Sequence, residues 1–403
     1  MQTRLADFIK DSAEGREADG ILRKCVHCGF CTATCPTYQL LGDELDGPRG
    51  RIYLIKESLE GQPVTAKTRL HLDRCLTCRS CETTCPSGVR YGRLLDIGRN
   101  LIEERAPRPL HERALRRSLR WLLPHPGRFA ALLRFGQSVR PLLPARVRRR
   151  VPPRQSAGHW PEPRHQRRIV CLAGCVQSSI APGINAAAAR VLDRLGVSLV
   201  PTTAAGCCGA VSHHLSARGE ALDVMRRNID AWWPQLERGA EAIVTGASAC
   251  SAMVKEYGEL LADDPEYAHK ASRVSALAKD LSEVIASEDL SALGNDTVLS
   301  RRVAFHSPCT LQHAQGIRGS VESILDARGH RLTQVADAHL CCGSAGTYSI
   351  LQRTLSERLR ENKLAALEAG KPELIATANI GCLMELRAAS DVPVVHWIEL
   401  LDE

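Results

Sequence analysis

The sequence predicts an α+β multidomain protein, in which a helical N-terminal domain is followed by two α/β repeats. Three observations lead to this prediction. Residues 1–104 contain two four-cysteine runs of identical spacing, residues 105–166 are rich in Arg and Pro, and from residue 167 onward the chain repeats itself once. We therefore expect four segments, with boundaries at 1–104, 105–166, 167–300 and 301–403.

The composition is typical of a globular protein that is neither exported nor inserted in a membrane. Apolar residues make up 44% of the 403 residues, which is ordinary for folded domains. The N-terminal stretch MQTRLADFIKDSAEGREADG is charged throughout and lacks the apolar centre of a secretory signal. No uninterrupted apolar run reaches about 18 residues. The expected location is the cytoplasm, where 17 cysteines favour metal binding or redox chemistry over disulfides.

The two N-terminal cysteine runs are CVHCGFCTATCP (25–36) and CLTCRSCETTCP (75–86), and both follow the spacing C-x2-C-x2-C-x3-C-P. Four thiolates at this spacing suit a [4Fe–4S] cluster, and in two-cluster ferredoxins the fourth cysteine ligates the other cluster. We therefore expect a ferredoxin-like domain with two 4Fe-4S clusters, the first held by Cys25, Cys28, Cys31 and Cys85, the second by Cys75, Cys78, Cys81 and Cys35. Two four-thiolate zinc sites are the alternative, although zinc sites usually pair two short C-x2-C knuckles.

The stretch between the two runs predicts helices. Ile52, Ile55 and Leu59 follow one another at helical spacing, and the segment VTAKTRLHLDRC leads into the second run. The module therefore resembles the helical iron–sulfur domain of succinate dehydrogenase more than the small β-rich ferredoxins. Arg49 and Arg51 are expected either to donate hydrogen bonds to cluster sulfides or to be solvated; their sequence positions do not decide between the two roles.

Residues 105–166 form a basic bridge, and the change in composition extends over residues 105–168. This stretch holds 17 Arg, no Lys and two Glu, in a chain whose net charge is +8. The pieces HERALRRSLRWLL and RFAALLRFG each place apolar residues on one helical face. Three roles remain open: a solvated linker packed on a neighbouring domain, a docking segment for an acidic partner, or a helix pair lying on an anionic membrane surface. Nucleic acid is not an expected partner, because no base-stacking aromatic pattern or recognition module accompanies the charge.

The second half of the chain contains an internal repeat. RRIVCLAGC (167–175) matches RRVAFHSPC (301–309), GCCGA (206–210) matches LCCGS (340–344), and AIVTGASAC (242–250) matches LIATANIGC (374–382). Helical segments lie between these landmarks, so each copy is predicted to alternate strands and helices, with its cysteines on loops at strand ends. Such loops share one edge of a parallel sheet, where these folds bind ligands.

Each repeat therefore offers four thiols as candidate metal ligands: Cys175, Cys207, Cys208 and Cys250, then Cys309, Cys341, Cys342 and Cys382. A thiol redox pair and plain packing are the alternatives. A disulfide between adjacent cysteines is disfavoured, because neighbouring Cα atoms lie about 3.8 Å apart and a relaxed disulfide needs roughly 4.4–6.8 Å. The odd Cys171 is expected to be an ordinary buried strand residue. Surface or capping roles are the default for the nearby histidines, His213, His214, His306, His313 and His339.

A double ferredoxin-type module followed by two Cys-Cys-Gly repeats resembles the iron–sulfur subunits of glycolate oxidase (glycolate dehydrogenase). The resemblance rests on CVHCGFCTATCPTY, DGPRGRIYLIKE, LAGCVQ and SPCTLQHAQG, and it covers nearly the full chain. It implies an electron-carrying subunit of a hetero-oligomer, whose flavin-containing partner holds FAD and oxidises glycolate. It also implies a quinone-type electron acceptor, and with it a location at the inner face of the cell membrane. This chain shows no G-x-G-x-x-G motif after a strand, so no dinucleotide site is expected here.

Several alternatives stay open from the sequence. Related Cys-Cys-Gly proteins serve lactate utilisation and heterodisulfide reduction, and a redox-responsive nucleic-acid binder is the remaining rival. Heterodisulfide reductase subunits end each repeat with C-x2-C, whereas Ala247 and Asn379 stand at the first cysteine position here. Only four thiols remain per repeat, so a further iron–sulfur cluster in the repeats would differ from a five-cysteine arrangement.

Overall fold

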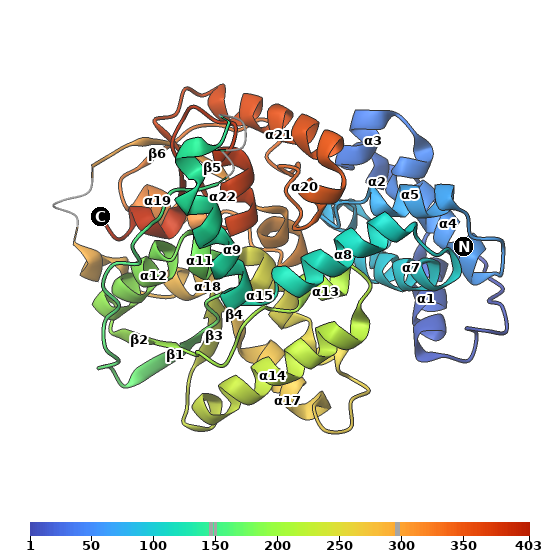
Figure 1. The fold of residues 1–403 in the computed structure, drawn as a ribbon, viewed down its shortest axis with the longest axis horizontal. Coiled ribbons are helices and arrows are strands. Elements are labelled where there is room, and N and C mark those ends of the chain that lie inside the picture. The colour runs from blue at the N-terminus through green and yellow to red at the C-terminus, as the bar shows by residue number, and fades with distance from the viewer. Residues whose placement is uncertain (145–147, 149–150, 295–298) are drawn as a thin grey trace. The chain divides into compact units, whose positions relative to one another are not determined.

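The structure is a computed structural model that describes residues 1–144, 148, 151–294 and 299–403 (Figure 1). Two of the predicted segments lie partly outside the described residues: the bridge at residues 145–147 and 149–150, and the first repeat at residues 295–298. The chain divides into two compact units. The first comprises Met1–Arg117 together with His339–Lys363, and the second comprises Ser118–Ala338 together with Leu364–Glu403.

The first unit is helical. Its elements are α1 (Ala13–Lys24), α2 (Phe30–Ala33), α3 (Pro36–Leu41), the short η1 (Glu44–Asp46), α4 (Pro48–Leu59), α5 (Ala66–Asp73), α6 (Ser80–Thr84), α7 (Tyr91–Arg105), α20 (Tyr348–Leu351), the start of α8 (Leu110–Leu122) and most of α21 (Arg353–Glu368).

The core of this unit forms where α7 packs against α1, α4 and α5. Ile55, Leu94 and Leu95 are completely buried there. Gly98 of α7 makes the close approach to α4 possible, because a Cβ atom at this position would lie 2.6 Å from a side-chain carbon of Ile55. Pro48 stands in the first turn of α4, where a missing N–H costs nothing. The predicted helices after the first cysteine run are thus present, and they position both runs.

The second unit contains two four-stranded parallel sheets. The first sheet has β1 (Arg167–Cys171), β2 (Val197–Pro201), β3 (Ala242–Thr245) and β4 (Ala278–Asp280), in the order β2-β1-β3-β4. The second has β5 (Arg302–His306), β6 (Arg331–Leu332), β7 (Leu374–Thr377) and β8 (Val394–His396), in the order β6-β5-β7-β8. All adjacent strands are parallel. The two sheets therefore repeat one topology, as the sequence repeat predicts.

The helices of the second unit precede, connect or follow these strands. They are α9 (Pro126–Ser138), α11 (Gln177–Ile180), α12 (Gly183–Arg194), α13 (Ala210–His214), α14 (Arg218–Glu237), α15 (Ser248–Lys255), α16 (Tyr257–Leu260), α17 (Ala268–Leu277), α18 (Leu281–Ala286), α19 (Ser320–Ala327) and α22 (Ile380–Arg387), with the shorter η2 (Arg140–Leu142), η3 (Leu290–Leu293), η4 (Thr310–Ala314) and η5 (Trp397–Leu400).

The predicted fold class is confirmed: a helical N-terminal domain precedes two repeats, each built on a parallel sheet. The fourth strands, β4 and β8, were not predicted, because three residues are too few to show a periodicity. Both amphipathic pieces of the bridge are helical, as α8 and α9. Within the described residues, no helix combines the length and the apolar character needed to cross a bilayer.

Candidate metal centres

The first group of thiols combines three cysteines of the first run with one from the second. Cys25, Cys28, Cys31 and Cys85 line one hollow of the helical unit. Burial, together with the neighbouring thiols of Cys25, Cys28 and Cys85, raises the pKa of Cys31 to about 11. Four thiols that cannot all ionise without a nearby cation are the donor set that a four-thiolate metal site requires.

The second group mirrors the first. Cys35, Cys75, Cys78 and Cys81 line another hollow. Burial raises the pKa of Cys81 well above its usual value, and the neighbouring Cys78, Cys75 and Cys35 act in the same direction. In both groups the structure brings the fourth cysteine of one run to the first three of the other, which is the exchange expected from the spacing.

The loops around the thiols share a backbone path. His27 and Thr77, which occupy equivalent positions in the two runs, have φ values of 56° and 55°. Gly29 and its equivalent Arg79 also have positive φ, at 85° and 59°, and each caps the short helix that follows. Left-handed residues at these positions bend each loop around its hollow. Ser80, the residue after Arg79, is buried.

Hydrogen-bond donors point at several of these sulfurs. The Thr77 N–H lies 3.4 Å from Cys75 Sγ, and the hydroxyl of Tyr91 donates to the same sulfur at 3.5 Å. The Val89 N–H lies 3.5 Å from Cys85 Sγ. Donors of this kind stabilise negative charge on sulfur, so the surroundings fit ligating thiolates. Sequence reasoning missed Tyr91, because nothing in the motif marks a tyrosine beyond the fourth cysteine.

The four cysteines of the first repeat meet in the second unit. Cys175 and Cys208 each donate a hydrogen bond to Cys207, which lowers the pKa of Cys207 well below its usual value. Cys208 is in turn hydrogen-bonded to Cys250. Cys175, Cys207 and Cys208 are buried, whereas Cys250, in the first turn of α15, is partly exposed. The expected convergence at one sheet edge is therefore present in this repeat.

Two buried side chains hold the Cys207–Cys208 peptide in place. The Asn228 amide donates to the Cys207 carbonyl at 2.7 Å, and the Tyr257 hydroxyl donates to the Cys208 carbonyl at 2.8 Å. The amide of Asn228 also donates to Tyr257 Oη at 3.0 Å. Neither residue was predicted from sequence, because each lies far along the chain on a helix with no cysteine motif.

The Cys-Cys-Gly turn has the same local geometry in both repeats. The N–H of Gly209 lies 3.4 Å from Cys207 Sγ, and the N–H of Gly343 lies 3.4 Å from Cys341 Sγ. Both glycines have left-handed φ values, of 93° and 88°. At Gly343 a Cβ atom would also lie 2.5 Å from the Ser356 carbonyl oxygen. Glycine is therefore required by conformation at both positions and by space at the second.

The second repeat distributes its cysteines over both units. Cys309 and Cys382 belong to the second unit, whereas Cys341 and Cys342 belong to the segment 339–363 of the first. All four are buried. Asn379 occupies the position at which heterodisulfide reductase subunits have an additional cysteine. Its amide lies 3.6 Å from Cys382 Sγ and can donate to it. The side chain at this position thus contacts the site without being a thiol.

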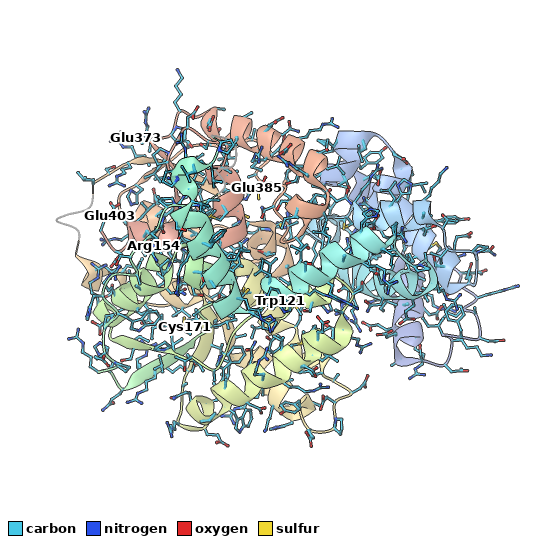
Figure 2. The ribbon with its side chains drawn as sticks, viewed as in Figure 1. Trp121, Arg154, Cys171, Glu373, Glu385 and Glu403 are labelled. Atoms are coloured by element: carbon cyan, nitrogen blue, oxygen red, sulfur yellow. The ribbon has the colours of Figure 1, made fainter. Side chains whose placement is uncertain are left out.

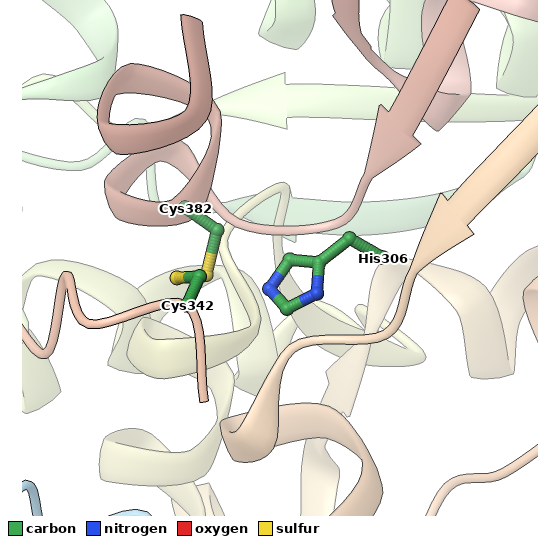
Figure 3. Close-up of side chains that lie close together, drawn as sticks. All are labelled: His306, Cys342 and Cys382. Carbon is green, nitrogen blue, oxygen red and sulfur yellow. The ribbon is translucent and has the colours of Figure 1, made fainter. Parts of the chain in front are cut away.

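Figure 3 draws His306, Cys342 and Cys382. His306 is the last residue of β5 and Cys382 lies on α22, both in the second unit. A ring nitrogen of His306 lies within 4.8 Å of the Cys382 sulfur. His306 and His313 are buried, so the surface role expected by default is wrong for these two histidines. His306 is a candidate ligand that the sequence did not single out.

Cys171 lies apart from these groups. It is buried at the end of β1 (Figure 2), and burial raises its pKa to about 12. No neighbouring thiol contributes to this shift. The interpretation of Cys171 as an ordinary strand residue agrees with this environment.

Comparisons with known proteins agree with these groups. Residues 21–89 match the model of a 4Fe-4S dicluster domain, and residues 169–255 and 303–387 match the model of a cysteine-rich domain. The chain is 57% identical to the glycolate oxidase iron-sulfur subunit of Escherichia coli K12, over 100% of this chain and 99% of that protein. It is 30% identical to the probable glycolate oxidase iron-sulfur subunit of Bacillus subtilis 168, over 98% and 96%. Lactate utilization protein A of Bacillus velezensis is 28% identical, over 58% and 97%.

Proposed function

Given that this chain belongs to the family of the glycolate oxidase iron–sulfur subunits, we propose that it carries electrons from the flavin of a partner subunit to a quinone-type acceptor. The full-length similarity to a subunit of glycolate oxidase supports a hetero-oligomer, and the two four-thiol groups of the helical unit support electron transfer. The substrate of the complex is a 2-hydroxy acid, for which glycolate is the proposal and lactate the alternative.

The proposed ligands of the first 4Fe-4S cluster are Cys25, Cys28, Cys31 and Cys85, and those of the second are Cys75, Cys78, Cys81 and Cys35. A bound cluster of this kind accepts and releases one electron at a time. The chain's own groups bend the loops and donate hydrogen bonds to the sulfurs. The four cysteines of the first repeat, and those of the second by equivalence, are proposed to hold a further iron–sulfur cluster.

The proposed division of labour predicts that this chain alone does not oxidise glycolate. The sequence has no G-x-G-x-x-G motif after a strand, so we expect hydride removal from the substrate to take place on a partner. With an artificial dye as acceptor, the cluster-loaded chain is expected to match the no-enzyme blank. Addition of the purified flavin subunit should restore glycolate-dependent dye reduction and should bleach the clusters in anaerobic stopped-flow measurements.

The same assay separates the rivals. Glycolate oxidation by the flavin-free chain would refute the subunit assignment. Faster turnover with lactate than with glycolate in the assembled complex would keep the electron-transfer role and reassign the substrate. The Cys28→Ser chain serves as a control, because this single change removes a proposed ligand of the first cluster and should lower electron transfer to the dye.

We also propose that the basic bridge contacts an anionic membrane surface. Six of its large apolar side chains are exposed among the arginines: Leu110, Leu115, Trp121, Leu132, Phe135 and Leu142. Arg128 lies over the Trp121 ring, 4.6 Å from its centre (Trp121 is labelled in Figure 2). Arginine beside exposed aromatic and aliphatic residues suits the headgroup region of anionic lipids.

Vesicle sedimentation tests this contact. The chain is expected to bind vesicles containing phosphatidylserine, to bind pure phosphatidylcholine vesicles weakly, and to be released by high salt. Replacing Trp121 and Phe135 by alanine should reduce binding about tenfold, from the loss of buried apolar area. The matched control is Ile350→Ala, which removes an exposed apolar side chain outside the bridge. Binding that is equal for both lipid compositions would overturn the proposal.

A further inference from the structure

A buried guanidinium lies beside one of the two cysteine groups of the helical unit. The Arg51 side chain, on α4, is only 1% exposed. Its Nε donates to the His71 carbonyl at 2.7 Å, Nη1 donates to Thr37 Oγ1 at 3.1 Å, and Nη2 lies 3.4 Å from Asp46 Oδ1. All three of its nitrogens are thus engaged, which fixes the plane and position of the cation.

The charge of Arg51 is not cancelled by its carboxylate partner. Asp46 is fully buried, and its Oδ2 lies 2.7 Å from Arg74 Nη1, closer than Oδ1 lies to Arg51. Two guanidinium cations therefore share one carboxylate, and one positive charge is left over among these three groups. In a buried location such a charge acts strongly on its surroundings, because little water screens it.

The surroundings of Arg51 are the thiols of the second group. Arg51 lines the same hollow as Cys35, Cys75, Cys78 and Cys81. Thr37, which accepts a hydrogen bond from Arg51, lies 3.3 Å from Cys35 Sγ. Burial acts to lower the pKa of Arg51, but the nearby Cys75, Tyr91, Cys35 and Asp46 raise it above its usual value.

Arg49, two residues away on the same helix, has the opposite environment. It lines the hollow of the first group, but its side chain is 38% exposed and its Nε is paired with Glu44 at 2.7 Å. Water and the carboxylate therefore screen its charge. Each cysteine group thus has four thiols, but the second group lies beside a buried arginine and the first beside a partly exposed, paired one.

We propose that the buried guanidinium of Arg51 raises the reduction potential of the cluster at Cys35, Cys75, Cys78 and Cys81 above that of the cluster at Cys25, Cys28, Cys31 and Cys85. The inference rests on the proposed function, since it requires both clusters. Reduction adds one negative charge to a cluster, and a fixed cation nearby stabilises the reduced form.

The Tyr348 hydroxyl, from the segment with the second Cys-Cys-Gly turn, donates to the Arg74 carbonyl at 3.1 Å. At equilibrium the electron therefore resides on the second cluster, near residues 339–363.

The test is a redox titration of the purified full chain, followed by EPR, with the two signals assigned through Cys28→Ser and Cys78→Ser. Arg51→Gln should lower the potential of the second cluster so that its reduced-to-oxidised ratio falls about tenfold at a fixed potential, a shift of about 59 mV for one electron. Arg51→Lys should keep most of the wild-type potential. The matched control Arg49→Gln should leave the first cluster within a few-fold of wild type.

Asp46→Asn provides a change of opposite sign. It removes the negative charge from the same network, so the reduction potential of the second cluster should rise. A merely loosened structure would not shift this potential in opposite directions in Arg51→Gln and Asp46→Asn. If Arg51→Gln fails to fold, Asp46→Asn and Arg51→Lys still decide the question. Equal potentials of both clusters in the wild type, an unchanged potential in Arg51→Gln or Asp46→Asn, or a potential of Arg51→Lys well below that of the wild type would overturn the inference. Wild-type protein without iron and sulfide would overturn the proposed function instead.

Discussion

Replacing Cys85 by serine is expected to abolish the cluster at residues 25–31 and to leave the cluster at residues 75–81 in place. Cys85 lies among the neighbours of Cys31 and lines the hollow of the first group. A serine hydroxyl is a poor substitute for a thiolate, so the first cluster would lose its fourth ligand. Iron and acid-labile sulfide in the ferredoxin-type domain should fall to about half, as one of two clusters is lost.

The reciprocal variant is the matched control. Cys35→Ser should remove the cluster of the second run, because Cys35 lines the hollow with Cys75, Cys78 and Cys81. Cys171→Ser should change neither signal, since this buried thiol lies outside both groups. EPR of the reduced protein, with iron, sulfide and zinc analysis, measures each case. If Cys85→Ser damaged the 75–81 cluster alone, the exchange of fourth ligands would be wrong. Stoichiometric zinc without a cluster signal would end the iron–sulfur interpretation.

Replacing both Cys207 and Cys208 by serine is expected to remove all metal bound by the first repeat. The two thiols are adjacent in sequence, both are buried, and they link Cys175 to Cys250 through hydrogen bonds. The low pKa of Cys207 favours the thiolate that a metal needs, and metal binding should weaken toward acid as the thiols become protonated. Metal per chain should fall by the full complement of one site.

The second repeat supplies the comparison. The Cys341→Ser/Cys342→Ser variant should lose the metal of its own site and retain that of the first repeat, since each Cys-Cys-Gly turn has its own glycine N–H facing the leading sulfur. His306→Leu, which introduces the residue found at the equivalent position of the first repeat, would show whether the buried imidazole contributes to the second site. Wild-type iron and sulfide in both double variants would assign the pairs to thiol redox chemistry or to packing.

The fold could be predicted from sequence because its signals are local. The spacing of the cysteine runs indicates an iron–sulfur module, and the helical spacing of Ile52, Ile55 and Leu59 between the runs indicates that the module is helical. The three matched landmarks of each repeat indicate the alternation of strands and helices. The strands β4 and β8 escaped prediction because each has three residues and depends on its neighbour for pairing. The boundaries of the four predicted segments stay a prediction; the compact units divide the chain differently, and residues 339–363 group with the N-terminal module.

The environment of the site could not be predicted, because it depends on which side of a helix faces inward. From the sequence, Arg49 and Arg51 cannot be distinguished: each is expected either to contact a cluster or to be solvated. Two residues along a helix turn the chain by about 200°, so one guanidinium reaches the interior while the other is exposed. Asn228 and Tyr257 have no motif at all; they are recognised only when the fold brings them to the Cys207–Cys208 peptide.

The discontinuous first unit has a consequence for biogenesis. Residues 118–338 separate its N-terminal part from the segment that contributes Tyr348, so the ribosome must synthesise the greater part of the second unit before the contact with Arg74 can form. At 5–20 residues per second this delay lasts roughly 10–45 seconds. During this interval the Arg74 carbonyl, next to Cys75, lacks the hydroxyl of Tyr348 as a hydrogen-bond donor. The first unit can therefore complete its fold only after most of the second unit has been synthesised.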